Sequence, residues 1–197
     1  MRRPLGEIIG LNITTSNMKT TLFMATSVNG FVARRDGDED FLPSDNWTRL
    51  LYYSKMYGHL IWGRKTYEAV ESWGENYINS LDDISIIIVS KSKKSFSRSN
   101  VSVCSSPEDA IKIAKSKNYK KAFLSGGPSL NTSFVKSNLV DEIILNCNPT
   151  ILANGIKLFN ESDFEMKLAL KNVNELSSGI VELCYIVINV IPDKSAQ

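Results

Sequence analysis

The chain has 197 residues, of which 43% are hydrophobic, 22% charged and 9% aromatic, a composition typical of one globular domain with a substantial buried core. The formal net charge of +2 is small and the cations are spread along the chain, so neither nucleic acid nor a membrane surface is the expected partner. No apolar run approaches the roughly 18 residues of a membrane span, and the N-terminus lacks the uncharged core of a signal peptide. We therefore expect a cytoplasmic protein.

The cysteines and the single histidine limit the chemistry that side chains can supply. Cys104, Cys147 and Cys184 lie far apart without the spacing of a metal site, which predicts buried reduced thiols. His59 lies between a glycine and an apolar segment, a context that favours a structural role. One histidine nearly excludes a Ser-His-Asp or Cys-His mechanism and a multi-histidine site, so we expect no metal.

Segments of strand and helix character begin at Lys19, so residues 1–18 are interpreted as an extension before one domain that spans 19–191. The first predicted strand covers 20–28 and ends at the turn Asn29-Gly30. A polar loop at 34–40 precedes an amphipathic helix over 44–57. A short strand at 60–62 then leads into a second helix.

The second half of the chain continues this alternation. Residues 84–89 and 101–103 are predicted strands, and Ser106-Pro107-Glu108-Asp109 starts a helix with a capping serine, a proline and first-turn acids. A strand at 121–125, a helix at 128–137 and a strand at 140–147 follow. The segments 164–170 and 178–188 alternate like two antiparallel strands.

This order of elements predicts a three-layer α/β fold. Its central sheet is mostly parallel, and the two C-terminal strands attach antiparallel at an edge. In such sheets, ligands bind at the carboxyl ends of the strands, where loops lead into helices.

Residues suited to phosphate binding follow three of the predicted strands. Gly126 and Gly127 allow a ligand to approach the backbone, and the next helix offers free N–H groups to an anion. Gly63-Arg64-Lys65-Thr66 and Ser90-Lys91 supply cations and hydroxyls. Each segment alone is more often a turn or a solvated loop, but one extended anion bridging all three would have the shape of a phosphorylated dinucleotide. No standard dinucleotide fingerprint or P-loop motif is present.

Several segments together resemble the dihydrofolate reductase superfamily. Residues 63–68 (GRKTYE) and 86–91 (IIIVSK) are similar to the second-strand junction and the ribose-phosphate loop of dihydrofolate reductases. Residues 125–130 (SGGPSL) and 139–145 (LVDEIIL) are closer to the reductase domain of riboflavin biosynthesis, which shares that fold. Residues 27–33 (SVNGFVA) and 178–183 (SGIVEL) also fit it, so the resemblance covers about residues 19–190.

The resemblance implies an NADPH-dependent reductase that orients the nicotinamide against a pyrimidine or pterin C=N bond. It places Ala25 and Val32 against the nicotinamide. It places the phosphates and riboses against Gly63, Arg64, Lys65, Thr66, Ser90, Lys91, Gly126, Gly127, Pro128, Ser129 and Leu130. It further implies a homodimer through the antiparallel edge strands.

The substrate side rests on the same resemblance. Leu42-Pro43-Ser44-Asp45 is similar to the dihydrofolate reductase segment whose acid anchors the pterin, which makes Asp45 the candidate catalytic acid. A structural alternative pairs Asp45 with Arg49 on one helix face, and the sequence leaves both open. Arg49 stands where those enzymes carry an aromatic residue, which favours a phosphoribosyl group.

The remaining substrate candidates are Asn29, Ser125 and Asn146. Asn146 stands where dihydrofolate reductases usually have threonine, and Asn29 where the riboflavin reductases usually have aspartate. The Asp-Asp-Pro stretch of the riboflavin reductases is also replaced, by the segment Tyr67–Trp73. These differences weaken the transfer of the riboflavin reductases' exact substrate to this chain.

The sequence thus predicts a riboflavin-pathway reductase acting on the ribosyl imine of 5-amino-6-(5-phosphoribosylamino)uracil. A dihydrofolate reductase is the nearest alternative. A nucleotide-binding module without catalysis is an alternative of a different class.

Overall fold

The structure is a computed structural model that describes residues 18–92 and 95–192. The extension predicted for the N-terminus lies outside the described residues except for Met18. That side chain is 3% exposed and packs in the core, so the fold begins one residue before the predicted boundary.

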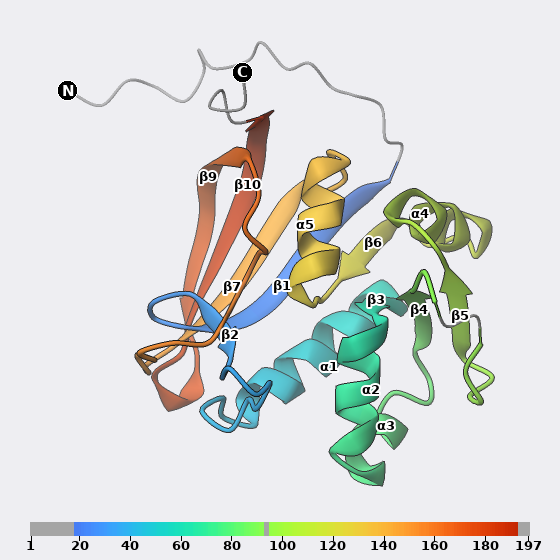
Figure 1. Cartoon of the computed structure of the whole chain (residues 1–197), viewed down its shortest axis with the longest axis horizontal. Helices are drawn as coiled ribbons and strands as arrows, with labels where there is room; N and C mark the ends of the chain where they lie inside the picture. The colour runs from blue at the N-terminus through green and yellow to red at the C-terminus, as the bar shows by residue number, and fades with distance from the viewer. Residues whose placement is uncertain (1–17, 93–94, 193–197) are drawn as a thin grey trace.

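Within the described residues, an eight-stranded sheet runs through the centre in the order β5-β4-β3-β6-β1-β7-β10-β9 (Figure 1). The strands span β1 Lys19–Ser27, β3 His59–Gly63, β4 Ser85–Val89, β5 Val101–Cys104, β6 Lys121–Leu124, β7 Glu142–Asn148, β9 Phe164–Glu175 and β10 Val181–Pro192. The strands from β5 to β7 pair in parallel, while β10 joins β7 and β9 joins β10 antiparallel. This confirms the predicted sheet.

Helices cover both faces of the sheet and complete the predicted three layers. On one face lie α1 Asp45–Tyr57, α2 Arg64–Ser72 and α3 Glu75–Asn79; on the other lie α4 Pro107–Ser116 and α5 Pro128–Lys136. Ser106 caps α4 as predicted, because its side chain accepts a hydrogen bond from the Asp109 N–H.

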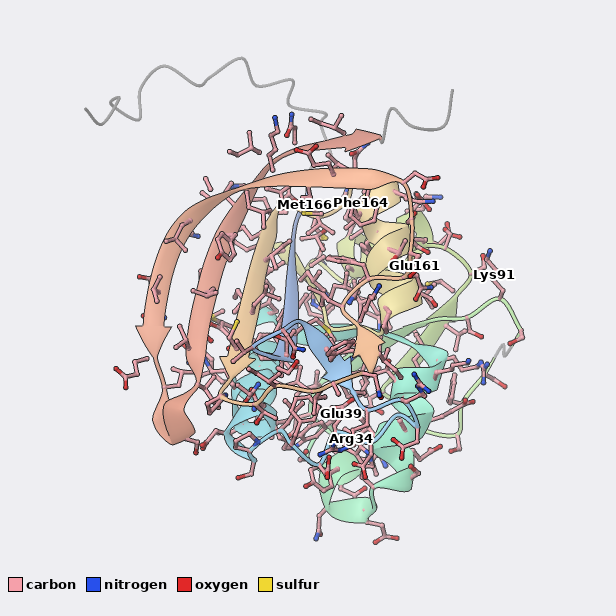
Figure 2. The ribbon with its side chains drawn as sticks, turned by 60° about the vertical axis from the view of Figure 1, so that its left-hand side comes forward. Arg34, Glu39, Lys91, Glu161, Phe164 and Met166 are labelled. Atoms are coloured by element: carbon pink, nitrogen blue, oxygen red, sulfur yellow. The ribbon has the colours of Figure 1, made fainter. Side chains whose placement is uncertain are left out.

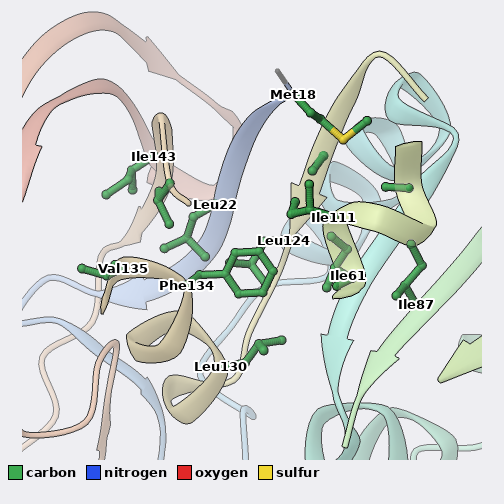
Figure 3. Packing of buried hydrophobic residues seen from close by; sticks show 14 residues of the cluster. Met18, Leu22, Ile61, Ile87, Ile111, Leu124, Leu130, Phe134, Val135 and Ile143 are labelled. Carbon is green, nitrogen blue, oxygen red and sulfur yellow. The ribbon is translucent and has the colours of Figure 1, made fainter. Parts of the chain in front are cut away.

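Alternate residues of the parallel strands point into separate cores. Ile87 joins the cluster beneath α4 and α5, whereas Ile86 and Ile88 join the cluster beneath α1, α2 and α3. Figure 3 shows the first cluster, in which Phe134 of α5 packs among side chains of the sheet. Both faces are buried, which explains why these strands are continuous apolar runs.

Several elements are absent from the sequence prediction or longer than predicted. The short pair β2 Phe31–Ala33 and β8 Ile156–Lys157 and the single-turn α3 were not predicted, because such short segments carry no periodicity. Strands β9 and β10 extend past their predicted ends and are joined through a 3₁₀ turn at Ser177–Gly179.

The thiols and the histidine differ in how well the sequence predicted them. Cys104, Cys147 and Cys184 are free thiols as predicted, but they are half-buried where burial was predicted; Cys104, for example, lies on the edge strand β5. His59 is fully buried, and its Nε2 accepts a hydrogen bond from the Phe123 N–H. Burial lowers the pKa of His59 to about 4, which agrees with a structural role.

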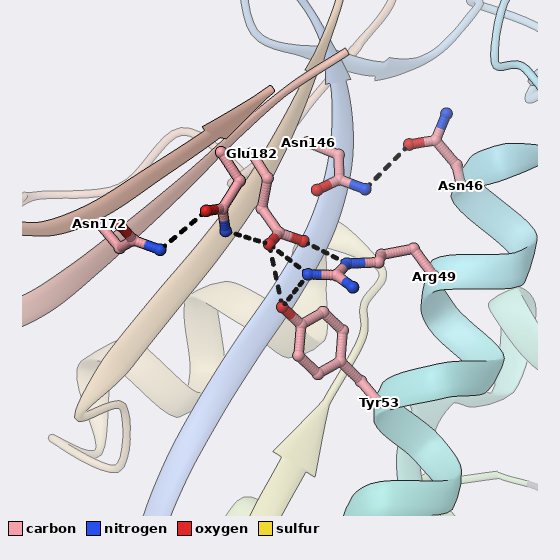
Figure 4. Close-up of polar contacts among 7 residues, drawn as sticks. Asn46, Arg49, Tyr53, Asn146, Asn172 and Glu182 are labelled. Carbon is pink, nitrogen blue, oxygen red and sulfur yellow. Dashed lines mark hydrogen bonds and ion pairs between the residues drawn. The ribbon is translucent and has the colours of Figure 1, made fainter. Parts of the chain in front are cut away.

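A buried carboxylate ties helix α1 to strand β10 (Figure 4). Glu182 is 0% exposed and accepts hydrogen bonds from Arg49 Nε at 2.7 Å and Arg49 Nη2 at 2.6 Å. The Tyr53 hydroxyl and Asn174 Nδ2 donate to it as well, each at 3.1 Å. Burial alone would raise the pKa of Glu182, but the hydrogen bonds from Arg49 and Asn174 outweigh burial and lower it.

The structure does not form the pair of Asp45 with Arg49 that the sequence left open as the structural alternative. Arg49 reaches across to Glu182, because its face of α1 packs against the antiparallel end of the sheet. The Asp45 carboxylate instead accepts a hydrogen bond of 2.6 Å from the Ser178 hydroxyl in the turn between β9 and β10.

We expect Arg49→Ala to lower the free energy of unfolding by about 3–5 kcal/mol at pH 7, because it leaves the Glu182 charge buried without its main partner. Urea denaturation followed by circular dichroism measures the loss. The matched control is Arg64→Ala, whose half-exposed pair with Glu68 on one helix is worth roughly 0.2–0.5 kcal/mol. Equal losses of unfolding free energy in the two variants would contradict the claim that the buried charge of Glu182 depends on Arg49.

The lowered pKa of Glu182 also sets the sign of a pH effect. Its contribution to stability is complete above the unfolded-state pKa of about 4.3 and is lost as the pH falls through the lower folded-state value. Glu182→Gln should therefore flatten the acid side of a plot of unfolding free energy against pH. An unchanged acid slope would refute this.

Candidate active site

A cavity of about 490 Å³ lies on the face of the sheet that α1, α2 and α3 cover. Its walls are Phe23, Met24, Ala25, Val32, Asp38, Glu39, Asp40, Leu42, Pro43, Ser44, Asn46, Trp47, Leu50, Trp62, Thr66, Val70, Trp73, Tyr77 and Ser125. Residues at the carboxyl ends of β1, β3 and β6 reach it, which is where open α/β sheets bind ligands. Of the predicted site residues, Ala25, Val32, Thr66 and Ser125 line it.

Two of the predicted phosphate junctions touch each other beside this cavity. The Gly63 N–H donates to the Gly126 carbonyl at 2.8 Å, because β3 and β6 are neighbouring parallel strands. A Cβ at Gly127 would lie 3.1 Å from Thr66 Oγ1, and one at Gly126, where φ is +78°, would lie 3.0 Å from Met24 Sδ. The positive φ of Gly126 favours glycine there, and a Cβ at either position would force Met24 or Thr66 to shift.

The third junction, Ser90-Lys91, lies next to the other two along the edge of the sheet. Val89 pairs with Gly63, so Ser90 and Lys91 leave the sheet next to the Gly63 junction. Figure 2 shows Lys91 on the loop that leaves β4, at the edge of the molecule, and its side chain is exposed. The structure thus brings the three junctions to one rim of the sheet.

The other predicted cofactor residues do not line the cavity. Arg64 Nη1 pairs with Glu68 at 2.6 Å, and Lys65 is exposed. Pro128 is the first residue of α5, and Ser129 Oγ accepts a hydrogen bond from Asn160. Leu130 packs its side chain into the core, and its Cβ would lie 3.7 Å from a Cβ placed at Gly63.

The substrate-side residues are rearranged relative to the prediction. Asp45 and Arg49 do not line the cavity, whereas Asn46 does. Asn46 is 6% exposed, donates to Asn148 Oδ1 at 2.7 Å and accepts from Asn146 Nδ2 at 3.2 Å (Figure 4). Asn29 bonds the Leu152 carbonyl at 2.7 Å and does not line the cavity.

An aromatic wall that the sequence analysis missed closes the outer side of the cavity. Trp47 lies 6.1 Å from Trp73 and 5.1 Å from Tyr77 between ring centroids, both edge to face, and 6.5 Å from Trp62. Such rings offer flat apolar surfaces to a planar ligand. Trp73 and Tyr77 are each 39% exposed, and such exposed aromatics near helix ends are the signal that could have revealed them.

The loop before α1 contributes carboxylates to the cavity. Asp38, Glu39 and Asp40 all line it, and Asp40 pairs with Arg34. Burial, followed by the negative charge of Asp38, raises the pKa of Glu39 to about 7. In the sequence these residues are part of an ordinary polar loop, so no local pattern distinguishes Glu39.

Two further findings concern the described part of the chain. Residues 18–92 and 95–192 contain no cluster of three or more His, Cys, Asp or Glu side chains that could hold a metal ion. None of the helices in these ranges is long and apolar enough to cross a membrane.

Comparison with known proteins now identifies the family. The family model described as the RibD C-terminal domain matches residues 18–182. The chain belongs to the RibD C-terminal domain family. This is a family of riboflavin-pathway reductases within the dihydrofolate reductase-like superfamily, so the predicted resemblance is confirmed.

Relatives of this RibD C-terminal domain include proteins of known sequence and of known structure. YyaP, an uncharacterised Bacillus subtilis protein, is 28% identical over 188 residues, covering 87% of this chain and 97% of YyaP. A pyrimidine reductase-like protein from Corynebacterium diphtheriae has the same fold, with a TM-score of 0.70 at 18% identity over 91% of this chain and 96% of its own.

A bifunctional relative is longer. The Thermotoga maritima diaminohydroxyphosphoribosylaminopyrimidine deaminase/5-amino-6-(5-phosphoribosylamino)uracil reductase matches with a TM-score of 0.68 at 14% identity. The alignment covers 89% of this chain but 58% of that protein.

The close contact at Gly126 generates a test. We expect Gly126→Ala to lose more stability than Gly30→Ala, since both glycines have φ near +80° but a Cβ at Gly30 meets nothing within 4 Å. The shared backbone strain costs roughly 1–2 kcal/mol, and the contact with Met24 adds to it at Gly126 alone. Urea denaturation compares the two, and equal losses would show that the Gly126 site has room to spare.

Proposed function

We propose that this protein is an NADPH-dependent reductase that delivers hydride to a C=N bond of a pyrimidine-like or pterin-like compound held in the cavity. The observation that carries this proposal is the contact between the Gly63 and Gly126–Gly127 junctions beside the aromatic cavity. That contact places the backbone of both junctions beside Thr66, which lines the cavity together with Ala25 and Val32. One dinucleotide could therefore place its nicotinamide in the cavity and its diphosphate on the junctions.

The residues present fit such a cofactor. Helices α2 and α5 both begin at glycine N-caps, Gly63 and Gly127, so their first-turn N–H groups are free of side-chain caps and favour an anion. Lys91, on the adjacent loop, would hold the ribose phosphate that distinguishes NADPH from NADH. When bound, NADPH supplies the hydride, and the protein's own part is to orient the ring and to exclude water.

The substrate that the family suggests first is 5-amino-6-(5-phosphoribosylamino)uracil, the compound in the name of the Thermotoga maritima relative. Dihydrofolate is the second candidate, because the superfamily and the aromatic wall both accommodate a pterin. The catalytic role predicted for Asp45 requires the carboxylate to leave Ser178 and turn toward the cavity. Full turnover in Asp45→Asn would remove that role without affecting the cofactor proposal.

The cofactor proposal is tested by titrating the protein with NADPH and NADH and following nicotinamide fluorescence. We expect NADPH to bind about ten-fold or more tightly than NADH, because the extra phosphate meets Lys91. Lys91→Ala should remove most of this difference, whereas Lys136→Ala, at the far end of α5, should leave it unchanged. Equal binding of the two cofactors by the unmodified protein would sink the NADPH assignment.

A homodimer through β9 and β10 also belongs to this proposal. Strand β9 is the edge of the sheet, and the apolar side chains of Leu168, Leu170, Val173, Val181, Ile186 and Ile188 on this pair of strands are exposed. An exposed apolar edge strand is a surface for pairing with another chain.

We expect light scattering to give a dimer mass for the unmodified chain and a monomer mass for Leu170→Lys, because a charge at the edge opposes pairing. Lys167→Ala, on the same strand, is the control and should remain dimeric. A monomeric parent protein would refute this interface.

A further inference from the structure

The charge of the cavity is opposite to what a phosphorylated substrate needs. Among the described residues, its lining contains the carboxylates of Asp38, Glu39 and Asp40 and no lysine, arginine or histidine. Asp40 is paired with Arg34 and part of the Glu39 population is protonated at neutral pH, so the repelling charges are Asp38 and the ionised fraction of Glu39. A phosphate monoester, with a charge of about −1.5 to −2 at pH 7, is repelled by them and finds no cation among the described residues of the lining. The cavity therefore disfavours the phosphate of the family's substrate.

The arginines on the elements that border the cavity are each paired with a carboxylate. Arg34 pairs with Asp40, Arg49 with the buried Glu182, and Arg64 with Glu68. Arg35 and Lys65 are exposed and do not line the cavity. Arg49 in particular, the residue that the sequence offered to a phosphoribosyl group, would have to abandon a fully buried carboxylate to reach one.

The remaining surface of the cavity suits a flat heterocycle. Trp47, Trp73 and Tyr77 form the aromatic wall, and Trp62 lies on the sheet side. Trp62 is 1% exposed, and within the described residues its indole Nε1–H has no hydrogen-bond partner. An unpaired buried donor at a cavity points to a ligand with an acceptor atom, since leaving it unpaired is costly.

We propose that the cavity binds an unphosphorylated, neutral or cationic nitrogen heterocycle, and that Glu39 donates the proton to its reduced nitrogen. This inference rests on the proposed reductase function and narrows its substrate class. Amino and ring N–H groups of the heterocycle would face the carboxylates of the loop before α1, and a ring acceptor would face Trp62. Its flat faces would lie against the aromatic wall.

The chemical step balances with these groups. The hydride of NADPH forms the new C–H bond as the C=N π bond breaks, and the Glu39 carboxyl proton forms the N–H bond. NADP⁺ and the Glu39 carboxylate are the products on the protein side, and one proton taken up from the solvent restores the carboxyl group, so the net reaction consumes NADPH and H⁺. Because the pKa of Glu39 is raised to about 7, a large fraction of this group carries its proton at neutral pH.

The other titratable groups that face Glu39 across the cavity are few. Asp38 and Asp40 belong to the same loop, and Tyr77 comes from α3. The lining residues that β1, β2, β3, α1, α2 and the segment after β6 contribute among the described residues carry no titratable side chain. A pH profile that reports one group near neutrality is thus readily traced to Glu39.

The test uses a matched pair of compounds, 5-amino-6-(5-phosphoribosylamino)uracil and the same compound without its phosphate, with 7,8-dihydropterin as a second unphosphorylated probe. Binding to the cofactor-free protein is followed by quenching of tryptophan fluorescence, and turnover by loss of NADPH absorbance. We expect the phosphate-free uracil to bind about ten-fold or more tightly than its phosphate ester. It should also have the higher kcat/KM.

The variant Glu39→Gln tests proton donation, because glutamine has nearly the same shape but no acidic proton. We expect kcat to fall by about 10²–10⁴-fold and the decline of kcat above the Glu39 pKa to disappear from the pH profile. The same variant should weaken the discrimination against the phosphate. Glu161→Gln, which removes an exposed carboxylate outside the cavity (Figure 2), should change none of these values.

The outcomes separate this inference from the proposed function. Equal or tighter binding of the phosphorylated compound, or no binding of any of the three compounds, would overturn the charge-based selection even if NADPH is oxidised. An unchanged pH profile in Glu39→Gln would overturn the proton transfer. Failure of NADPH to bind would sink the proposed reductase, while the fluorescence titrations would still decide the charge of the preferred ligand.

Discussion

The position of helix α1 depends on one buried charge. Glu182 on strand β10 is fully buried and accepts hydrogen bonds from Arg49, Tyr53 and Asn174. If α1 moved away, this carboxylate would remain in a low-dielectric interior without its main partners, which is costly. The face of α1 that this network fixes is not the face that meets the ligand. The adjoining face carries Asn46, Trp47 and Leu50 into the cavity, and its position follows from the anchor.

The rim of glycine junctions and the cavity use different parts of the chain. Along the rim, Gly63, Gly126 and Gly127 allow close packing of the backbone, and the parallel pairing of β4, β3 and β6 brings the junctions side by side. The cavity, in contrast, is lined by side chains: aromatic faces, one indole N–H without a partner among the described residues, and the carboxylates of a loop.

A rotation of one residue along α1 explains why Asn46, and not Asp45, lines the cavity. Each step along a helix turns the side chain by about 100°, so Asp45 and Asn46 cannot face the same surface. Similarity to the dihydrofolate reductase segment aligned Asp45 with the acid, whereas the structure points Asn46 at Asn146 and the cavity. Asp45 turns instead to Ser178, in the turn between β9 and β10.

The sequence by itself determined the order and type of the long elements, because apolar runs and the cap at Ser106 are local signals. It also determined the glycine junctions, because a positive φ and a close approach of the backbone favour glycine. Only the tertiary structure decided which side chains face which. The partner of Arg49 lies 133 residues away, and Glu39 differs from its acidic neighbours in how deeply the fold buries it. Such long-range contacts and the desolvation that accompanies them leave no mark in a short window of sequence, and they are what set the charge of the cavity.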